Sequence, residues 1–279
     1  MSKDDLLFNI TTVQTNAFKN LIEALNCILI DCNFEIVPDD ENNNDGGCIK
    51  ILAVNNQISM LVHLKLQSKN FDVFQCKKNQ IIGINMQNFY KIIKPITNSD
   101  ILSIYRESSS ENRNRLCINI NNKEKKQVFN YSIQIIDIDN DVLDISKVTF
   151  EAIVVMNSND FQKILKDMNG LEAKNVNISL IGNTFKIYCC GDIGNGCAEL
   201  YENESGNIFI NRQKGCEDVV ITGKYELKNL LLFTKCTNLC NSIEIYLKND
   251  YPIFIKYTIA SLGYMHLCLS PLIEQNEFN

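Results

Sequence analysis

The chain has 279 residues, of which 45% are hydrophobic, 22% are charged and none is tryptophan. This length exceeds what one hydrophobic core usually fills and suits two similar domains. The net charge of −6 argues against a protein that coats nucleic acid with its whole surface, although it allows a local basic strip. Because the sequence contains no run of roughly 18 apolar residues and no signal-peptide pattern at its start, we expect a soluble, intracellular protein without a membrane partner.

Short strand-like runs fill most of the sequence in chain order. They are rich in Ile, Val, Tyr and Phe, they often alternate with polar residues, and Asn, Asp, Gly and Ser separate them. The runs cover residues 34–37, 49–54, 59–66, 71–76, 101–105, 116–120 and 131–136 in the first half, and residues 152–156, 177–181, 185–190, 197–201, 208–211, 242–247, 254–259 and 264–269 in the second.

Four segments have helical rather than strand spacing of their apolar residues: 16–28, 85–94, 158–168 and 222–235. Asn85, Ser158 and Thr222 are predicted N-caps of the last three. The starts of the four segments are 69, 73 and 64 residues apart, which indicates an internal repeat. We therefore predict an α+β fold of two similar domains with two helices each, residues 1–136 and 150–279, joined by an Asp-rich connector at 137–149.

The cations of this acidic chain are concentrated on the predicted helices. Eight lysines against four acidic residues give these segments a net charge of +4. One interpretation is an ordinary solvated helix face, and the other is a basic surface that binds phosphates without reading sequence. None of the four arginines lies on these helices, which argues against base-specific readout in the major groove.

Catalytic and metal-binding patterns are missing from the sequence. It has no GxGxxG, GxxxxGK[ST], HExxH or GxSxG motif, and we predict neither enzymatic activity nor a cofactor nor a metal site. The glycine-rich stretch from Gly191 to Gly196 fits a hairpin turn between two strands better than a phosphate-binding loop. The twelve cysteines are scattered without CxxC spacing, and His63 and His266 are far apart, so we interpret the thiols as reduced side chains packed like small hydrophobes.

An ordered set of sequence words resembles the proliferating cell nuclear antigen family from about Leu7 to Glu274. The words include NAFKNLIEALNCILIDCNFEI, QSKNFDVFQCKKNQIIGINMQNFYKIIK, GDIGNG, LLLFTKCTNL and YPIFIKYTIASLGYMHLCLSPLIE. The resemblance implies the DNA-clamp fold, in which two-domain subunits form a homotrimeric ring with helices around the central hole. It implies a sliding clamp that encircles double-stranded DNA without sequence preference, acts as a processivity factor in DNA replication and repair, and docks DNA polymerase, the clamp loader, flap nuclease and ligase.

The resemblance also assigns DNA-facing positions on the helices. Asn20 and Asn26 stand at positions that are often basic in the family, so the first helix is expected to contribute less. The implied DNA-binding residues are Lys19, Lys91, Lys94, Lys163, Lys166, Lys228 and Lys235.

Two further sets follow from the resemblance alone. The family's partner pocket takes a Gln-x-x-aliphatic-x-x-aromatic-aromatic peptide, and Cys268 and Ile58 depart from the residues usual there. The subunit interface is implied at Tyr131 of one subunit and at Ala198, Leu200 and Tyr201 of its neighbour, on a predicted edge strand. The implied pocket residues are Val54, Ile58, Leu61, Leu143, Ile145, Pro252, Cys268, Ser270 and Pro271.

Several alternatives stay open at the level of the sequence. A viral or checkpoint-type relative would keep the fold but act as a heterotrimer or as a monomer. An all-β hydrolase or carbohydrate-binding module is disfavoured by the lack of Trp, of a catalytic motif and of paired carboxylates. We expect a nuclear protein, or one at the viral replication site if the source is a virus.

Overall fold

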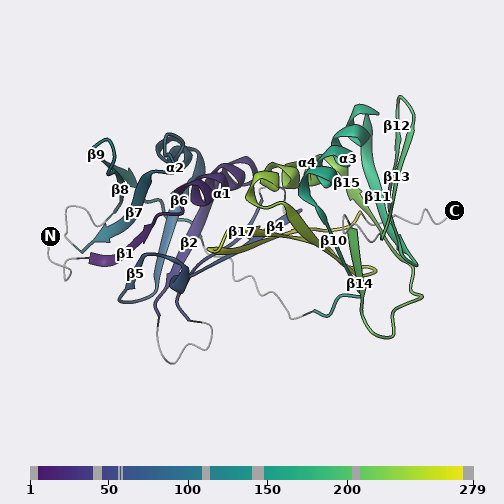
Figure 1. Cartoon of the computed structure of the whole chain (residues 1–279), viewed down its shortest axis with the longest axis horizontal. Helices are drawn as coiled ribbons and strands as arrows, with labels where there is room; N and C mark the ends of the chain where they lie inside the picture. The colour runs from purple at the N-terminus through teal and green to yellow at the C-terminus, as the bar shows by residue number, and fades with distance from the viewer. Residues whose placement is uncertain are drawn as a thin grey trace. The chain divides into compact units, whose positions relative to one another are not determined.

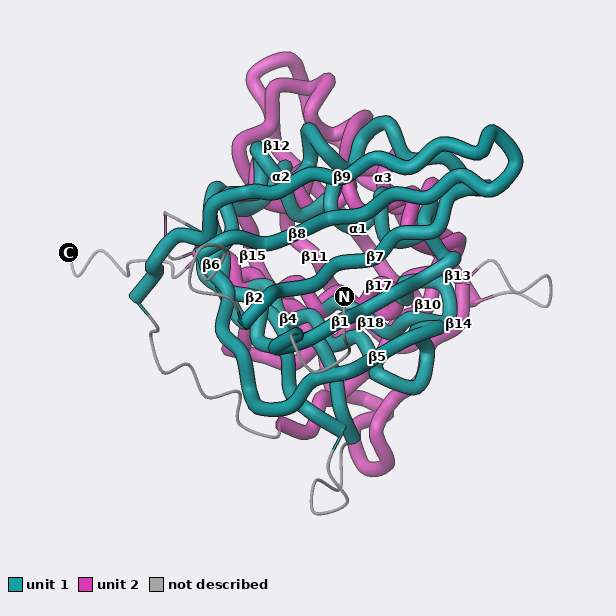
Figure 2. The backbone as a smooth tube through the Cα atoms, turned by 90° about the vertical axis from the view of Figure 1, so that its left-hand side faces the viewer, with its two compact units in different colours: residues 1–56, 62–143, 258–265 teal, residues 57–61, 144–257, 266–279 magenta. Residues whose placement is uncertain are grey.

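The computed structural model describes residues 6–39, 46–55, 57, 59–108, 114–139, 148–202 and 208–272. Contacts divide the chain into two compact units, which have different colours in Figure 2. Unit 1 comprises residues 1–56, 62–143 and 258–265, and unit 2 comprises residues 57–61, 144–257 and 266–279. Each unit thus includes a short segment from the other half of the sequence: residues 258–265 belong to unit 1 and residues 57–61 to unit 2. The domain bounds 1–136 and 150–279 stay predictions.

Unit 1 contains a five-stranded antiparallel sheet in the order β5–β1–β7–β8–β9, which faces the viewer in Figure 2. Strands β4, β3, β2 and β6 are neighbours in that order. Along β4, buried and half-buried residues alternate strictly, as the period of two in a strand requires. The strands are β1 (Leu6–Thr12), β2 (Asp31–Val37), β3 (Cys48–Val54), β4 (Met60–Gln67), β5 (Val73–Cys76), β6 (Gln80–Asn85), β7 (Asp100–Glu107), β8 (Arg115–Asn122) and β9 (Gln127–Gln134).

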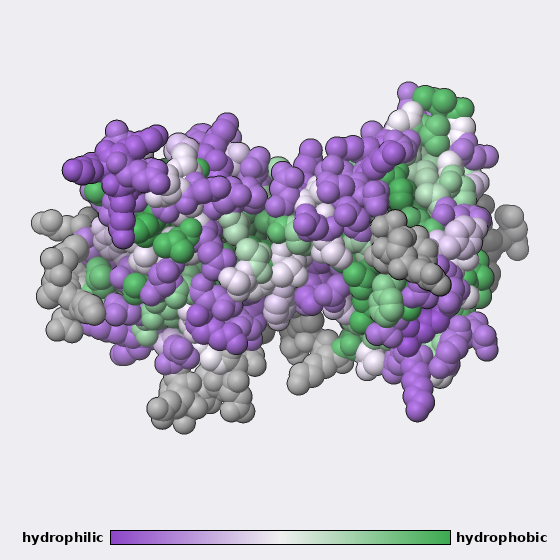
Figure 3. Space-filling model, in the orientation of Figure 1, coloured by the Kyte–Doolittle hydropathy of each residue, from purple (hydrophilic) through white to green (hydrophobic). Residues whose placement is uncertain are grey.

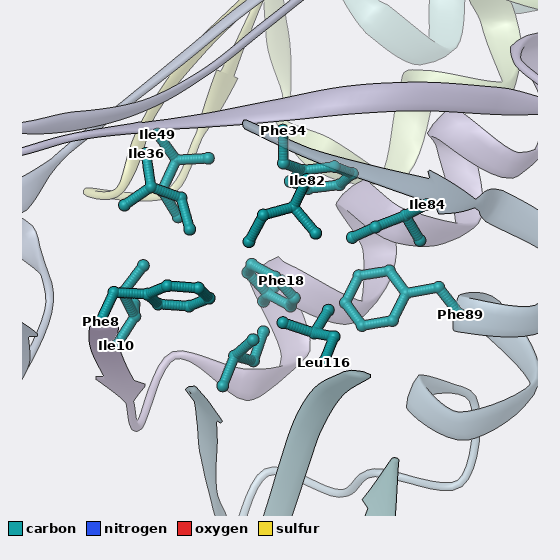
Figure 4. A pocket seen from close by; sticks show the side chains of 11 residues that line it. Phe8, Ile10, Phe18, Phe34, Ile36, Ile49, Ile82, Ile84, Phe89 and Leu116 are labelled. Carbon is teal, nitrogen blue, oxygen red and sulfur yellow. The ribbon is translucent and has the colours of Figure 1, made fainter. Parts of the chain in front are cut away.

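The core of unit 1 lies between these strands and the helices α1 (Thr15–Ile28) and α2 (Met86–Ile93). Figure 4 shows side chains from both groups of strands and both helices pointing toward one another around a small cavity. The Phe89 ring packs edge-to-face against Phe18 and Phe34, with centroids 6.4 and 6.0 Å apart. Every residue that lines the cavity is apolar, so it is a gap in packing without chemistry for a ligand.

Unit 2 repeats this arrangement with its own strands and helices. A four-stranded antiparallel sheet has the order β13–β12–β11–β15, and β14, β10, β16 and β17 are neighbours in that order. Helix α3 (Ser158–Gly170) contacts β10 and β11, and α4 (Leu227–Phe233) contacts β11 and β15. The strands are β10 (Ala152–Asn157), β11 (Ala173–Ile181), β12 (Thr184–Gly191), β13 (Asn195–Tyr201), β14 (Ile208–Arg212), β15 (Ile221–Glu226), β16 (Ser242–Leu247), β17 (Ile253–Ile259) and β18 (Gly263–Leu269).

The predicted helix starts are confirmed in one case and corrected in two. Asn85 caps α2, because its side-chain oxygen accepts a hydrogen bond from Asn88 N at 3.0 Å. The cap of α3 is Asn157, whose side chain accepts from Asn159 N, and not Ser158. Thr222 does not start the fourth helix, because residues 221–226 form β15 and pair with β11.

Residues 221–226 form a strand because they pair with β11, although the spacing of apolar residues in 222–235 predicted a helix. The ladder between β15 and β11 runs from Ile221 to Glu226 and buries the side chains of Ile221 and Tyr225. Helix α4 is therefore only seven residues long, and the 3₁₀ helix η3 (Thr234–Leu239) continues it. In the described part of the chain each unit has two α-helices, as predicted, and the α+β fold is confirmed. Figure 1 labels these helices and the strands around them.

The predicted hairpin at Gly191–Gly196 is confirmed as the turn between β12 and β13. Gly191 N donates to Gly194 O at 2.9 Å, which closes the turn. A Cβ on Gly191 would lie 2.0 Å from the carbonyl oxygen of Leu171, so only glycine fits at this position.

Candidate nucleic-acid interface and docking surfaces

In unit 1, helices α1 and α2 contact each other and bury one apolar face each. Lys91 and Lys94 follow each other at a spacing of three on α2 and its C-cap, so they share a face, and both side chains are exposed. Figure 3 shows hydrophilic residues gathered over these helices. This face of unit 1 can offer two ammonium groups to an anionic ligand.

Lys19 on α1 differs from these two lysines. It is half-buried, and its Nζ donates to the carbonyl oxygen of Ile96 at 3.1 Å. Ile96 follows the C-terminus of α2, where a cation is favourable because the last carbonyls of a helix carry partial negative charge. Lys19 therefore has a structural contact within unit 1, and the smaller contribution expected of the first helix stays a prediction.

The loop after α2, which contains Ile96, is stabilised by the buried carboxylate of Asp100. Asp100 accepts hydrogen bonds from Thr97 N at 2.7 Å, from Thr97 Oγ1 at 2.9 Å and from Asn122 Nδ2 at 2.6 Å. Burial alone would raise the pKa of Asp100, but these hydrogen bonds outweigh it and hold the pKa below its usual value. Thr97 O in turn accepts from Thr15 Oγ1 at the start of α1.

In unit 2 the lysines are spread over three helical elements. Lys163 and Lys166 lie three residues apart on α3, Lys228 lies on α4 and Lys235 on η3, and all four are exposed. Lys166 Nζ donates to the neutral Gln162 side chain at 3.0 Å, which leaves its charge uncompensated by that contact. Lys224 and Glu226 were counted with the predicted fourth helix but belong to β15. Because one is a cation and the other an anion, the net charge of the four predicted helices without these two residues is still +4.

The predicted subunit-contact residues lie on strands at the ends of sheets. Among the described residues, β9 pairs only with β8, and β13 pairs only with β12. On β9, Phe129 and Tyr131 stack with centroids 6.5 Å apart and are 46% and 38% exposed. On β13, Tyr201 is 58% exposed, and Ala198 and Leu200 are half-buried.

Polar contacts organise the outer face of β13. Glu199 forms an ion pair with Lys186 on β12 at 2.7 Å and accepts from Tyr201 Oη at the same distance. The hydrogen bond from Lys186, followed by that from Tyr201, lowers the pKa of Glu199. The tyrosine hydroxyl is thus held by its own strand, while its ring stays exposed at the sheet edge.

The predicted peptide-pocket residues belong to both units, and three of them, Ile58, Leu143 and Ile145, lie outside the described residues. In unit 1, Val54 is half-buried at the end of β3. In unit 2, Leu61, Pro252 and Pro271 are half-buried and Ser270 is exposed, whereas Cys268 is buried with 5% exposure. Burial raises the pKa of the Cys268 thiol above its usual value.

Unit 2 also holds candidate docking residues that the sequence analysis did not single out. The ring of Phe150 lies 5.3 Å from Tyr246, 6.0 Å from Tyr251 and 5.2 Å from Phe254. These half-buried rings flank Pro252, which stands between Tyr251 and Phe254 in the chain. The aromatic residues Tyr251 and Phe254 beside Pro252 are visible in the sequence, but the position of Phe150 required the fold.

A second group adjoins Ser270 in unit 2. Ser270 N donates to Ser59 O at 3.4 Å, and Asn229 Nδ2 donates to Ser59 Oγ at 3.4 Å and to Glu226 Oε2 at 2.7 Å. In the described part of the chain, the Oδ1 atom of Asn229 is the one buried side-chain oxygen or nitrogen without a hydrogen-bond partner. The surroundings of Ser270 are therefore polar and rich in acceptors.

The described residues offer no group of three or more His, Cys, Asp or Glu side chains that could hold a metal ion. Six of the twelve cysteines are buried like small packing residues, whereas Cys27, Cys190 and Cys197 are exposed. Burial raises the pKa of the Cys32 thiol to about 12. In the same part of the chain, no helix is long and apolar enough to cross a membrane.

Comparison with known proteins supplies the identity of this fold. Residues 7–145 match the N-terminal domain model of proliferating cell nuclear antigen, and residues 144–272 match its C-terminal domain model. "Probable DNA polymerase sliding clamp 1" of Paramecium bursaria Chlorella virus 1 is 28% identical over 98% of this chain and all of its own length. "Probable DNA polymerase sliding clamp" of Acanthamoeba polyphaga mimivirus is 29% identical over 98% of this chain and 64% of its own length.

A cellular relative gives the same result. "Proliferating cell nuclear antigen" of Chaetomium thermophilum is 28% identical over 95% of this chain and 97% of its own length. The two matched domain models follow each other along the chain with a two-residue overlap, and each covers one of the two structural repeats. The chain therefore belongs to the proliferating cell nuclear antigen family of DNA polymerase sliding clamps, which are processivity factors and not catalysts.

Proposed function

We propose that this chain is the subunit of a homotrimeric ring that encircles double-stranded DNA and tethers replication and repair proteins to it. The observation that carries this proposal is the concentration of exposed lysines on the helices of both units in a chain of net charge −6. Family membership supports the general function of a sliding clamp. The proposals for ring closure, DNA contact and partner docking each rest on particular residues.

Ring closure is proposed to use β9 of one subunit and β13 of the next. Each strand has an open edge among the described residues, and an open edge bearing exposed aromatic side chains favours association. Pairing of Tyr131 on β9 with Ala198, Leu200 and Tyr201 on β13 would cover both edges by a head-to-tail contact. Such a contact between different surfaces closes into a ring when its rotation allows.

DNA contact is proposed to be weak and independent of sequence. Lysine contacts to phosphates alone give dissociation constants on the order of 10⁻⁴ to 10⁻⁶ M at physiological salt. A closed ring does not need a higher affinity for DNA, because DNA is released only when a subunit interface opens. Weak contacts also allow the ring to slide along the DNA. The proposed contacts are Lys91, Lys94, Lys163, Lys166, Lys228 and Lys235, with a smaller part for Lys19.

Partner docking is proposed at Val54, Ile58, Leu61, Leu143, Ile145, Pro252, Cys268, Ser270 and Pro271. A peptide of the Gln-x-x-aliphatic-x-x-aromatic-aromatic type would dock there and carry DNA polymerase, clamp loader, flap nuclease or ligase. The half-buried rings around Pro252 support an apolar contact of this kind. Docking raises the effective concentration of the polymerase at the primer end, which is the source of processivity.

The two viral relatives favour a second reading of assembly and location. A viral clamp can act as a heterotrimer or as a monomer, and it would work at the viral replication site, whereas a cellular one would work in the nucleus. Solution mass separates these candidates before any functional assay.

The test is light scattering during size exclusion at two protein concentrations. A homotrimer has a mass of about 96 kDa, three times the 31.9 kDa of the chain. Substitution of Tyr201→Asp should reduce the mass to that of one chain, because it puts a charge into an apolar contact. Ile30→Asp, at a position 60% exposed and outside the proposed interface, is the matched control and should leave the trimer intact. A wild-type protein that stays at 31.9 kDa would contradict the homotrimer.

A further inference from the structure

The segment that leads into the connector lies against the edge of β6 in unit 1. Ile136 N donates to Gly83 O at 3.0 Å, and the two residues form an isolated antiparallel bridge. Ile135 N donates to Asn114 O at 2.9 Å, and Asn33 Nδ2 donates to Ile138 O at 3.1 Å. Residues 135–138 are therefore held at three points by two strands and a turn of the same unit.

Gly83 is required by close approach and not by its backbone conformation. Its φ is not positive, so other residues could adopt its conformation. A Cβ at this position would lie 2.2 Å from Ile136 O and 3.1 Å from the Ile138 side chain. A glycine inside a strand lowers strand stability, so a steric reason for its presence is informative.

Asn33 and Gly83 act on the same segment from neighbouring strands. They are direct cross-strand partners in the β2–β6 ladder. Gly83 offers its backbone carbonyl to Ile136, and Asn33 offers its side-chain amide to Ile138 two residues further on. Because β6 pairs with β2 alone among the named strands, the Ile136 contact also covers part of its open edge.

We propose that Gly83 and Asn33 form a clamp that fixes the root of the connector and thereby positions the connector for partner-peptide binding. The proposal rests on the docking function proposed above and makes both residues positioning residues, which need not touch the peptide. A connector released at its root samples more conformations, and the fraction competent to bind falls. The apparent dissociation constant rises by the reciprocal of that fraction.

The experiment uses the full-length protein and two variants, Gly83→Ala and Asn33→Asp. The alanine methyl group displaces Ile136, and the aspartate replaces the donor to Ile138 O by an acceptor of the same shape. Amide hydrogen exchange at Ile136 reports the clamp, and fluorescence anisotropy with a labelled Gln-x-x-aliphatic-x-x-aromatic-aromatic peptide reports docking. Gly170→Ala is the control, since a Cβ there meets no atom within 4 Å.

The expected result is loss of protection at Ile136 and a weaker peptide affinity in both variants. If release leaves about one tenth of the molecules competent, the dissociation constant of Gly83→Ala rises about tenfold. Asn33→Asp should give a smaller rise, and Gly170→Ala none. Solution mass and the salt dependence of DNA binding should stay at wild-type values in all three.

Two results would overturn the proposal and differ from each other. If wild-type protein does not bind the peptide, the docking function fails and the positioning role with it, whatever the exchange data show. If wild-type protein binds and the variants lose protection at Ile136 without losing affinity, docking stands and the clamp has no positioning role. Should Gly83→Ala fail to fold, Asn33→Asp carries the same test without a new methyl group.

Discussion

The helices of unit 1 and of unit 2 come from the same structural repeat, yet they present different charges. Helix α1 carries a single lysine, which contacts Ile96 O, whereas α3 carries two exposed lysines. On the α-helices of unit 1 and their C-caps, the exposed cations are Lys91 and Lys94, while the helical elements α3, α4 and η3 of unit 2 carry four. The number of lysines in a helical segment therefore does not equal the number of exposed ammonium groups. The ammonium group of Lys19, for example, donates a hydrogen bond to a backbone carbonyl of its own unit.

The largest effect should come from removing the aromatic support of the helices in unit 1. Phe89→Ala deletes a ring that packs edge-to-face against Phe18 and Phe34 and lines the core cavity. We expect a loss of about 3–5 kcal/mol in the free energy of unfolding, measured by chemical denaturation. Phe209→Ala, at a ring 54% exposed in unit 2, should change stability by less than about 0.5 kcal/mol. Equal losses would contradict the assignment of Phe89 to the core.

The contrast in charge predicts unequal contributions to DNA binding. Each phosphate contact adds about 0.9 to the slope of log affinity against log salt. Replacing Lys163, Lys166, Lys228 and Lys235 by Ala should lower that slope by about 3.6, and replacing Lys91 and Lys94 by about 1.8. The measurement is anisotropy of a labelled duplex over a salt series, with solution mass as the control for assembly. An unchanged slope in either variant would remove that unit from the DNA interface.

The Asp100 network should make the loop after α2 sensitive to acid. The pKa of Asp100 is below its usual value, so its hydrogen bonds stabilise the fold at neutral pH, and this contribution fades as the pH falls below about 4. Asp100→Asn should cost about 1–3 kcal/mol at pH 7. The deficit relative to wild type, followed by denaturation at several pH values, should shrink toward acid. A constant deficit would show that the charge of Asp100 is not its source.

The smallest effect on DNA binding should follow from Lys19→Met. The substitution keeps the apolar stem and removes an ammonium group that already donates to Ile96 O. We expect the salt slope to change by much less than about 0.9, while Lys91→Met, at an exposed position, should lower it by about that value. A full-size change for Lys19→Met would mean that its contact with Ile96 breaks when DNA binds.

The sequence by itself determined the repeat, the α+β class and the enrichment of lysine on the helices. Apolar spacing in residues 16–28 and 158–168 and strand alternation are local properties, and both are retained in the structure. The family resemblance, carried by ordered words along the chain, was likewise readable without coordinates and is confirmed by the two matched domain models.

The tertiary structure alone decided the features that depend on distant partners. Residues 222–226 became strand because β11, more than forty residues earlier, pairs with them and buries Tyr225. Lys19 became half-buried because Ile96 O lies within reach, and Phe150 joined the rings around Pro252 because β16 and β17 bring them together. Local propensity is worth tenths of a kcal/mol per residue, whereas a ladder with buried side chains is worth several, so the distant contacts prevail.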